Sequence, residues 1–234
     1  MIRKLLVVFL ILNITSCDEL QQVVKQLPQA GTIGNTDIAS GLRAALDLGI
    51  DKQVTKLTQT DGFFKNELVK IVLPEELSKV DKALRNIGLS KLADEGLKVL
   101  NRAAEDAVQE ATPIFVNAVK DITFDDAKNI LLGNNDAATQ YLTSKTQDAL
   151  YSKFNPVIKN SFSKVGADKI WSNLINKYNS IPLTNNVNPD LTDYVTGEAL
   201  KGVFTMIAVE ENDIRTKASS RTTDLLKKVF ALQD

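Results

Sequence analysis

The sequence contains no histidine and a single cysteine, Cys17, among its 234 residues. Without histidine, the chain lacks the commonest metal ligand and the usual general base near neutral pH. Ser-His-Asp and Cys-His catalysis are therefore excluded within this chain. One cysteine excludes an intramolecular disulfide, and typical zinc sites are excluded because only carboxylates remain downstream of Cys17. We expect neither a metal nor a cofactor.

An excess of either charge is also lacking, with 28 Lys and Arg residues against 29 Asp and Glu residues. Loss of residues 1–16 would remove Arg3 and Lys4 and leave 26 against 29, a net charge of −3. This balance offers no basic surface, so no nucleic-acid partner is expected. A weakly acidic surface also has no electrostatic attraction of its own for anionic lipid headgroups.

The first sixteen residues have the layout of a bacterial export signal. Arg3 and Lys4 form a short basic region, and residues 5–12 are an apolar run too short to span a bilayer as a permanent helix. The following residues, Ile14-Thr15-Ser16-Cys17, resemble the lipobox of bacterial lipoproteins. That resemblance implies that Cys17 receives a lipid and that residues 1–16 are cleaved as a signal peptide. The alternative is an ordinary signal peptide followed by a chance cysteine.

Acyl chains on Cys17 would hold a water-soluble domain at a membrane. Each buried CH₂ contributes about 0.8 kcal/mol, so one chain anchors marginally and two signals anchor stably. Residues 17–34 continue from Cys17 as a polar stretch typical of a tether. We expect a cell-envelope protein that faces the periplasm. Asp18 resembles the inner-membrane retention signal of enteric bacteria, but other lineages read this position differently, so inner or outer membrane stays open.

Hydrophobic residues recur at helical spacing through most of residues 35–234. In residues 36–57 they predict one buried helix face. Its members are Ile38, Leu42, Leu46, Ile50, Val54 and Leu57. Similar stretches, bounded by proline, glycine and capping residues, predict a single all-α domain of about nine helices.

Two segments interrupt this pattern. Residues 60–73 contain the turn signal Asp61-Gly62 and a short apolar run that ends at Pro74, which favours one short β-hairpin there. Residues 148–163 contain Pro156, which predicts a kinked helix or two short ones, separate from a helix over residues 137–146.

Polar residues on two predicted helices are candidates for a ligand or partner site. Arg102 and Glu105 lie three residues apart, which predicts an exposed ion pair or, alternatively, a buried Arg102 that reaches another helix or a ligand. Asp136 precedes a helix that carries Thr139 and Tyr141. Helix N-termini bind anions, so Asp136 either caps this helix itself or belongs to a ligand-binding loop.

Further candidates lie near the C-terminus. Glu211 and Arg215 have the spacing of an i,i+4 ion pair, and Glu210 lies close enough to the apolar face of its helix to be half buried. A perturbed carboxylate there would be a site candidate, with a structural ion pair as the alternative. Arg221 precedes a last helix that has Asp224 in its first turn, and it could dock onto a carboxylate elsewhere.

Several segments together resemble the bacterial DUF4197 family, a family of unknown function, over roughly residues 35–231. They are Asn35–Leu42, Asn101–Glu105, Asp136–Tyr141, Asp193–Thr196 and the most specific, Arg221–Phe230. The resemblance implies a single exported helical domain, often carried by a lipoprotein. It implies no activity, ligand or catalytic residue.

These observations predict a non-enzymatic envelope protein that binds a partner protein or an apolar ligand between its helices while the lipid on Cys17 holds it at the membrane. The alternative is a hydrolase of envelope polymers whose acid and base come from Glu105, Asp136, Glu210 or Glu211. A pair of carboxylates across an open cleft, about 5–9.5 Å apart, would favour the hydrolase. An apolar tunnel or patch would favour binding.

Overall fold

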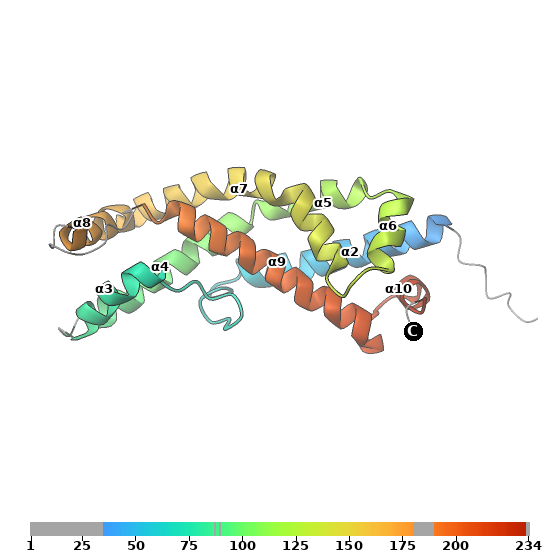
Figure 1. Cartoon of the computed structure of the whole chain (residues 1–234), viewed down its shortest axis with the longest axis horizontal. Coiled ribbons are helices and arrows are strands. Elements are labelled where there is room, and N and C mark those ends of the chain that lie inside the picture. Colours follow the sequence, from blue (N-terminus) through green and yellow to red (C-terminus); the bar gives the residue numbers. More distant parts are fainter. Residues whose placement is uncertain (1–34, 87, 89, 180–189, 233–234) are drawn as a thin grey trace, which may run out of the picture. The chain divides into compact units, whose positions relative to one another are not determined.

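A computed structural model describes residues 35–86, 88, 90–179 and 190–232. These residues are helical and connected by loops, which confirms the all-α prediction (Figure 1). The export signal, Cys17, the tether and residues 180–189 lie outside the described residues. The helices are α2 (Asn35–Thr58), α3 (Glu75–Asn86), α4 (Ser90–Val108), α5 (Ala111–Lys120), α6 (Phe124–Leu131), α7 (Ala137–Val165), α8 (Ala167–Asn179), α9 (Thr192–Thr216) and α10 (Asp224–Phe230), with a 3₁₀ turn η1 (Ala218–Ser220) before the last.

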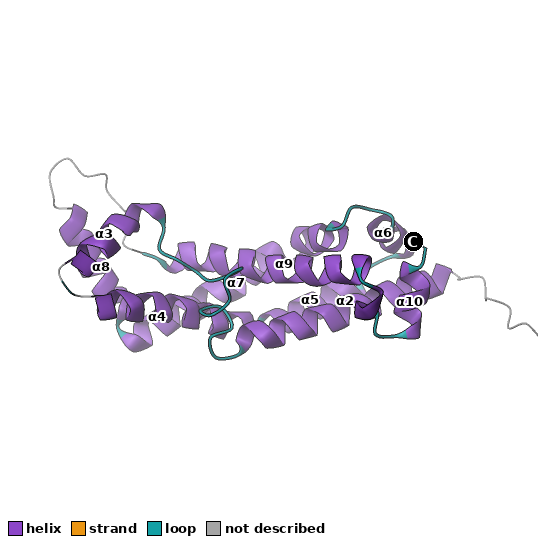
Figure 2. Ribbon diagram, turned by 90° about the horizontal axis from the view of Figure 1, so that it is seen from below, coloured by secondary structure: helices purple, strands orange, loops and turns teal. Residues whose placement is uncertain are grey.

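The two long helices α7 and α9 pack along each other through the middle of the helical domain. Helices α3, α4 and α8 lie toward one end of this pair, and α6 and α10 lie toward the other (Figures 1 and 2). Helix α2 contacts α5, α6, α9 and α10, and α4 contacts α7 and α9. Because each helix buries one apolar stripe, these contacts form one continuous core. None of the described helices is long and apolar enough to cross a membrane.

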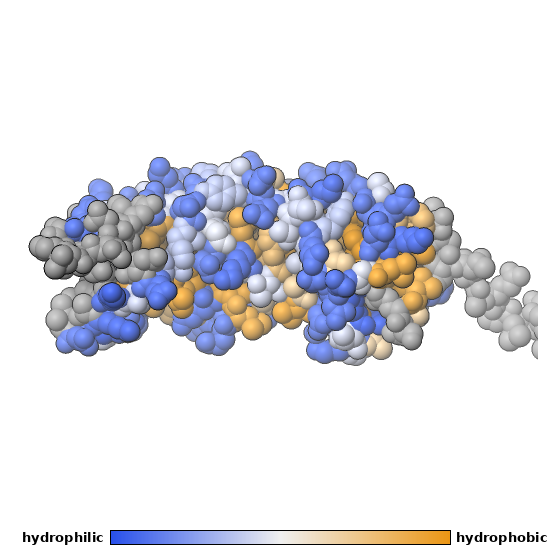
Figure 3. Space-filling view, in the orientation of Figure 1, coloured by the Kyte–Doolittle hydropathy of each residue, from blue (hydrophilic) through white to orange (hydrophobic). Residues whose placement is uncertain are grey.

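The core reaches the surface of the domain on the face in Figure 3. Polar residues cover the upper and lower edges of this face, and apolar residues are visible between them (Figure 3). The centre of the core contains large side chains that have no exposed surface. They include Phe63, Phe115, Phe154, Leu42, Leu100 and Leu142.

The predicted β-hairpin near residues 60–73 is wrong. The described residues contain no strand, and residues 59–74 form an irregular loop of successive turns (Figure 2). Phe63 is fully buried, and a Cβ atom on Gly202 of α9 would lie 2.6 Å from the Phe63 ring, so glycine permits this close packing. The loop is therefore held in place by a core residue and by polar contacts from α4, not by pairing of strands.

The predicted break between residues 146 and 148 is also wrong, because α7 continues through it and contains Pro156. Proline inside a helix removes one hydrogen bond and costs about 3 kcal/mol. Pro156 lies on the exposed side of α7, where the carbonyl that loses its partner can bind water. Phe154 and Ile158 on either side of it are fully buried, so packing keeps the helix continuous.

Two other helices begin with a local cap. The Thr123 hydroxyl accepts a hydrogen bond from the Asp126 N–H at 3.1 Å, and the Asp126 carboxylate accepts one from the Thr123 N–H at 3.0 Å, which forms a capping box at the start of α6. The Thr223 hydroxyl accepts a hydrogen bond from the Leu226 N–H at 3.1 Å at the start of α10.

Candidate functional site

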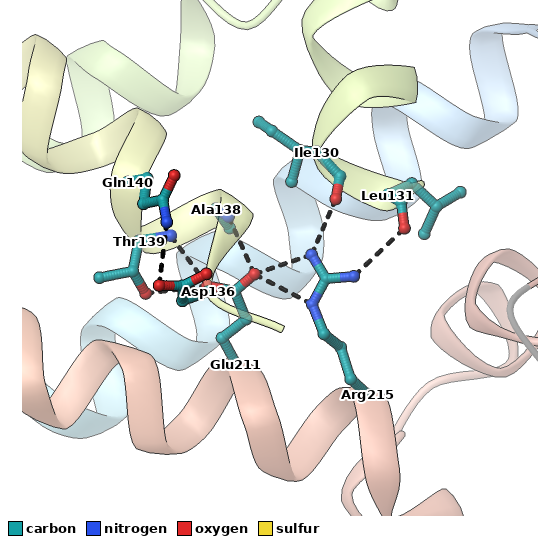
Figure 4. A network of polar contacts seen from close by, with 8 residues as sticks. All are labelled: Ile130, Leu131, Asp136, Ala138, Thr139, Gln140, Glu211 and Arg215. Atoms are coloured by element: carbon teal, nitrogen blue, oxygen red, sulfur yellow. Dashed lines mark hydrogen bonds and ion pairs between the residues drawn. The ribbon is translucent and has the colours of Figure 1, made fainter. Parts of the chain in front are cut away.

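The N-terminus of α7 is capped by Glu211, which lies on α9. Asp136 occupies the capping position, but its side chain makes no capping hydrogen bond and instead accepts one from the Gln140 side chain at 3.0 Å. Glu211 accepts hydrogen bonds at 2.8 Å from the backbone N–H of Ala138 and from the backbone N–H and hydroxyl of Thr139 (Figure 4). The anion at this helix N-terminus is thus a side chain of the protein itself.

Arg215 pairs with Glu211 and also caps the C-terminal end of α6. Its Nη2 lies 2.7 Å from the Glu211 carboxylate, so the predicted i,i+4 ion pair is present. The same guanidinium donates hydrogen bonds to the carbonyls of Ile130 at 2.8 Å and Leu131 at 3.2 Å (Figure 4). Glu211 and Arg215 are each only 7% exposed. We call Glu211, Arg215 and these partners on α6 and α7 the α9 network.

Glu210 points toward α2. Its carboxylate lies 2.7 Å from the Lys52 Nζ and accepts a hydrogen bond from the Gln53 amide at 2.6 Å. Glu210 and Glu211 both line one small cleft where α2, α9 and α10 meet, with otherwise mostly apolar walls and a volume of about 20 Å³. Such a volume holds about one water molecule.

Arg221 caps the end of α9. Its guanidinium donates hydrogen bonds to the carbonyls of Ile214 at 3.0 Å and Arg215 at 2.9 Å. It also lies 5.9 Å from the centre of the Phe230 ring, and Arg215 lies 6.0 Å from the same ring. These contacts join α10 to the end of α9. That Arg221 docks onto a carboxylate stays a prediction, beside these hydrogen bonds to carbonyls.

A second polar cluster lies on α4 and holds the loop formed by residues 59–74. The Asn101 side chain accepts a hydrogen bond from the Ile71 N–H and donates one to the Ile71 carbonyl, both at 2.8 Å. Asn101 and Ile71 have no exposed surface. One amide side chain therefore takes the place of a neighbouring strand for a buried loop residue.

Arg102 and Glu105 extend this cluster along α4. They form the predicted ion pair at 2.5 Å, and Arg102 also lies 2.6 Å from the Asp61 carboxylate in the loop. Glu105, which is 3% exposed, accepts a hydrogen bond from the Phe63 N–H at 3.1 Å. The Arg102–Glu105 pair therefore connects α4 to the loop, and it is not only an exposed ion pair on one helix. We call Asn101, Arg102, Glu105 and their loop partners the α4 clamp.

Tyr141 and Asp224 lie outside both clusters. Tyr141 is half-buried on α7, in a groove between α5, α6 and α7. Burial, followed by the nearby charges of Asp126 and Asp121, raises the pKa of the Tyr141 phenol. Asp224 is exposed in the first turn of α10 and pairs with Lys227 at 3.3 Å.

The structure brings Thr139, Glu211 and Arg215 into one network, and Arg102 and Glu105 into another. The sequence interpretation missed three residues: Lys52, Gln53 and Asn101. The role of Asn101 could have been found from the sequence. Asn101 lies one turn from Leu97 on the apolar side of its helix, where a polar residue needs a buried partner. Nothing in the local pattern of Lys52 and Gln53 pointed to Glu210.

The candidate carboxylates Glu105, Glu210 and Glu211 have partners within the protein. The oxygens of Glu105, Glu210 and Glu211 all accept hydrogen bonds or pair with cations of the protein. Within the described ranges, no group of three or more metal-ligating side chains comes together. The two clusters join helix ends and a loop to neighbouring helices, so their chemistry stabilises the architecture.

Comparison with known proteins places the chain by its family. No curated protein and no solved structure matches it. A family model described as "Protein of unknown function (DUF4197)" matches residues 32–231, which is most of the sequence. The resemblance seen in the sequence motifs is therefore confirmed, and the chain belongs to the DUF4197 family.

Proposed function

We propose that this protein is a lipid-anchored protein of the bacterial cell envelope whose helical domain faces the periplasm and binds a partner protein. The observation that carries the anchor is the order of residues 1–17: a basic region, an apolar run and then Ile14-Thr15-Ser16-Cys17. Two or more acyl chains on one residue bind a bilayer stably, whereas a single chain does so only marginally. Inner and outer membrane are both compatible with this proposal.

Binding is favoured over hydrolysis by the state of the candidate carboxylates. Glu210 and Glu211 line the same cleft, but both are occupied by donors of the protein. The cleft volume of about 20 Å³ is far below that of ordinary ligand sites, about 300–1,000 Å³. The same size argues against an apolar ligand between these helices and leaves the surface of the domain as the binding element.

The loop of residues 59–74 is the surface best suited to a protein partner. Leu68 is 64% exposed and Val72 is 55% exposed, although both lie in a loop whose backbone the α4 clamp binds at Phe63 and Ile71. The Tyr194 hydroxyl donates a further hydrogen bond to the Val72 carbonyl at 2.8 Å. Exposed apolar side chains on a preorganised backbone reduce the entropy lost on binding.

The charge of this loop favours a protein over a lipid surface. Its two acidic residues, Asp61 and Glu67, balance its two lysines, Lys65 and Lys70. Without a net positive charge, the loop gains little attraction to anionic headgroups. An apolar patch with mixed charges beside it is typical of a protein interface with an apolar centre and a polar rim.

Replacement of Cys17 tests the anchor. We expect the native protein to fractionate with membranes, and mass spectrometry to find a lipid on a Cys17 N-terminus. The variant Cys17→Ser should leave the membrane fraction, because it has no thiol to acylate. An unmodified Cys17 thiol in the native protein, or full membrane retention of Cys17→Ser, would overturn the anchor.

Charge substitution at the loop tests the partner surface. Photo-crosslinking in cells from a probe at position 68 should give a defined adduct, and Leu68→Asp should abolish the same adduct when the probe is at position 72. The matched control is Leu132→Asp, because Leu132 is also 64% exposed but lies at the end of α6. Equal adduct yields in the two Asp variants would reject the loop as the interface.

A further inference from the structure

A groove with polar walls lies between α5, α6 and α7, away from the loop of residues 59–74. Its volume is about 490 Å³, within the range of ordinary ligand sites. Ile114 and Ala118 line it from α5, and Ala149 lines it from α7. The groove is partly open to solvent, which suits a segment of a longer chain better than an enclosed small molecule.

Polar groups from the same helices line the groove beside these apolar residues. They are Asn117, Asp121, Tyr141 and Lys145. Within the described part of the chain, their side chains make no hydrogen bond, in contrast to the polar residues of the α9 network and the α4 clamp. A carboxylate only accepts, an ammonium only donates, and an amide and a phenol do both. The matching ligand therefore carries donors and acceptors together.

The charges in the groove argue against a strongly ionic ligand. Asp121 and Asp126 lie close enough to Tyr141 to raise the pKa of its phenol further, after the effect of burial. The charge of Arg43 opposes them at Tyr141, and the Lys145 ammonium lies 5.6 Å from the centre of the Tyr141 ring. A polyanion would meet the two carboxylates, and a polycation would meet the lysine.

We propose that this groove binds an uncharged, hydroxyl-rich saccharide segment. Hydroxyl groups donate and accept, so they match Asn117, Asp121, Tyr141 and Lys145 at once. The apolar face of a sugar ring would lie against Ile114, Ala118 and Ala149. The source of the saccharide, a glycan polymer of the envelope, rests on the proposed function, but the binding chemistry does not.

The test uses the full-length protein, purified in detergent, and saturation-transfer NMR titrations. The probes are a trimer of N-acetylglucosamine, maltotriose, and spermidine as a cationic comparison. We expect at least one trisaccharide to bind with a Kd below about 10 mM. Tyr141→Phe should weaken it about fivefold and Asp121→Asn about tenfold, as expected for a neutral and a charged hydrogen bond.

Two further variants keep the test decisive. Tyr151→Phe is the matched control, because Tyr151 is an exposed tyrosine of the same helix whose hydroxyl bonds to Asp193 outside the groove. Its affinity should be unchanged. Ala149→Trp fills the groove at an exposed position that does not disturb the core, and it should abolish binding.

Three results would overturn the proposal: no saturable trisaccharide binding, binding of spermidine alone, or trisaccharide binding that Tyr141→Phe and Ala149→Trp leave unchanged. Because the purified protein is titrated in detergent, a missing lipid on Cys17 would not affect these results. Failure of the anchor and failure of the saccharide site are therefore distinguishable. A pull-down with insoluble envelope glycan then separates a polymer from a free sugar, and retention by Tyr151→Phe but not by Ala149→Trp supports the polymer.

Discussion

The α9 network and the α4 clamp both use side chains of one helix to satisfy backbone groups that lie elsewhere in the chain, but they differ in burial. In the α9 network, Glu211 and Arg215 are each 7% exposed. In the α4 clamp, the Arg102 side chain is 31% exposed, while Asn101 is fully buried. A buried charge that loses its partner cannot be rescued by water, whereas a half-exposed one can.

This difference assigns separate roles to the two clusters. The α9 network fixes the start of α7 and the end of α6, so its loss should reduce the stability of the whole domain. The α4 clamp holds only the loop of residues 59–74, which carries the proposed partner surface. Its outer contacts should be weak enough to be altered without unfolding the domain.

The largest expected effect is that of Glu211→Ala. It leaves the Arg215 guanidinium buried without a carboxylate and removes the acceptor of the Ala138 and Thr139 N–H groups. We expect the free energy of unfolding to fall by about 3–5 kcal/mol, the cost of breaking a buried ion pair from one side. Urea denaturation followed by circular dichroism measures this change.

A double variant and a surface variant are the controls for Glu211→Ala. Glu211→Leu with Arg215→Met removes both charges and should be clearly more stable than Glu211→Ala, because no buried charge is left unpaired. Glu198→Ala breaks an exposed pair with Lys201 on the same helix and should change the stability by less than about 0.5 kcal/mol. Equal effects of Glu211→Ala and Glu198→Ala would contradict the assigned role of the α9 network.

The next effect in size is that of Asn101→Ala, in the buried half of the α4 clamp. The Ile71 N–H and carbonyl lose their partner in a site without solvent, which should cost about 2 kcal/mol. Hydrogen exchange of the Ile71 amide should accelerate accordingly. Lys65→Ala is the control at the edge of the same loop, because it breaks the exposed pair with Asp61, and it should cost less than about 1 kcal/mol. A larger cost for Lys65→Ala would reverse the order expected from burial.

The sequence predicted well what depends on neighbouring residues. The helix expected over residues 36–57 is α2, Asn35–Thr58, because one apolar stripe specifies it. The capping position of Thr123 was also predictable, since its partner is Asp126, three residues away. The family resemblance, over roughly residues 35–231, covered nearly all of the match over residues 32–231, but it implied no site.

The sequence could not predict contacts between distant parts of the chain. Asp136 has the right type and position for a cap, yet Glu211, more than 70 residues away, supplies the capping carboxylate. The apolar run at residues 68–73 resembles a strand, but its backbone partner is the Asn101 side chain, 30 residues from Ile71. Tertiary packing decided both cases, and local propensity carried no information about it.

The smallest expected effect concerns Asp61, at the exposed edge of the α4 clamp. The Asp61 pKa is lowered below 3.8 mainly by the hydrogen bond from Lys65. The charge of Arg102 lowers it further. Because the folded pKa lies below the unfolded value, the stabilisation is complete above about pH 4 and is lost as the pH falls through the folded pKa.

An NMR titration of the Asp61 carboxyl carbon therefore ranks its two cations. Lys65→Ala should move the Asp61 pKa back toward 3.8 by more than Arg102→Ala does, although Arg102 is the closer partner at 2.6 Å against 2.9 Å. The reverse order would mean that Arg102 controls Asp61 and that the outer part of the clamp is a coupled ion network. Arg102 would then connect the loop to Glu105 electrostatically as well as by position, and the contrast with the α9 network would be one of degree only.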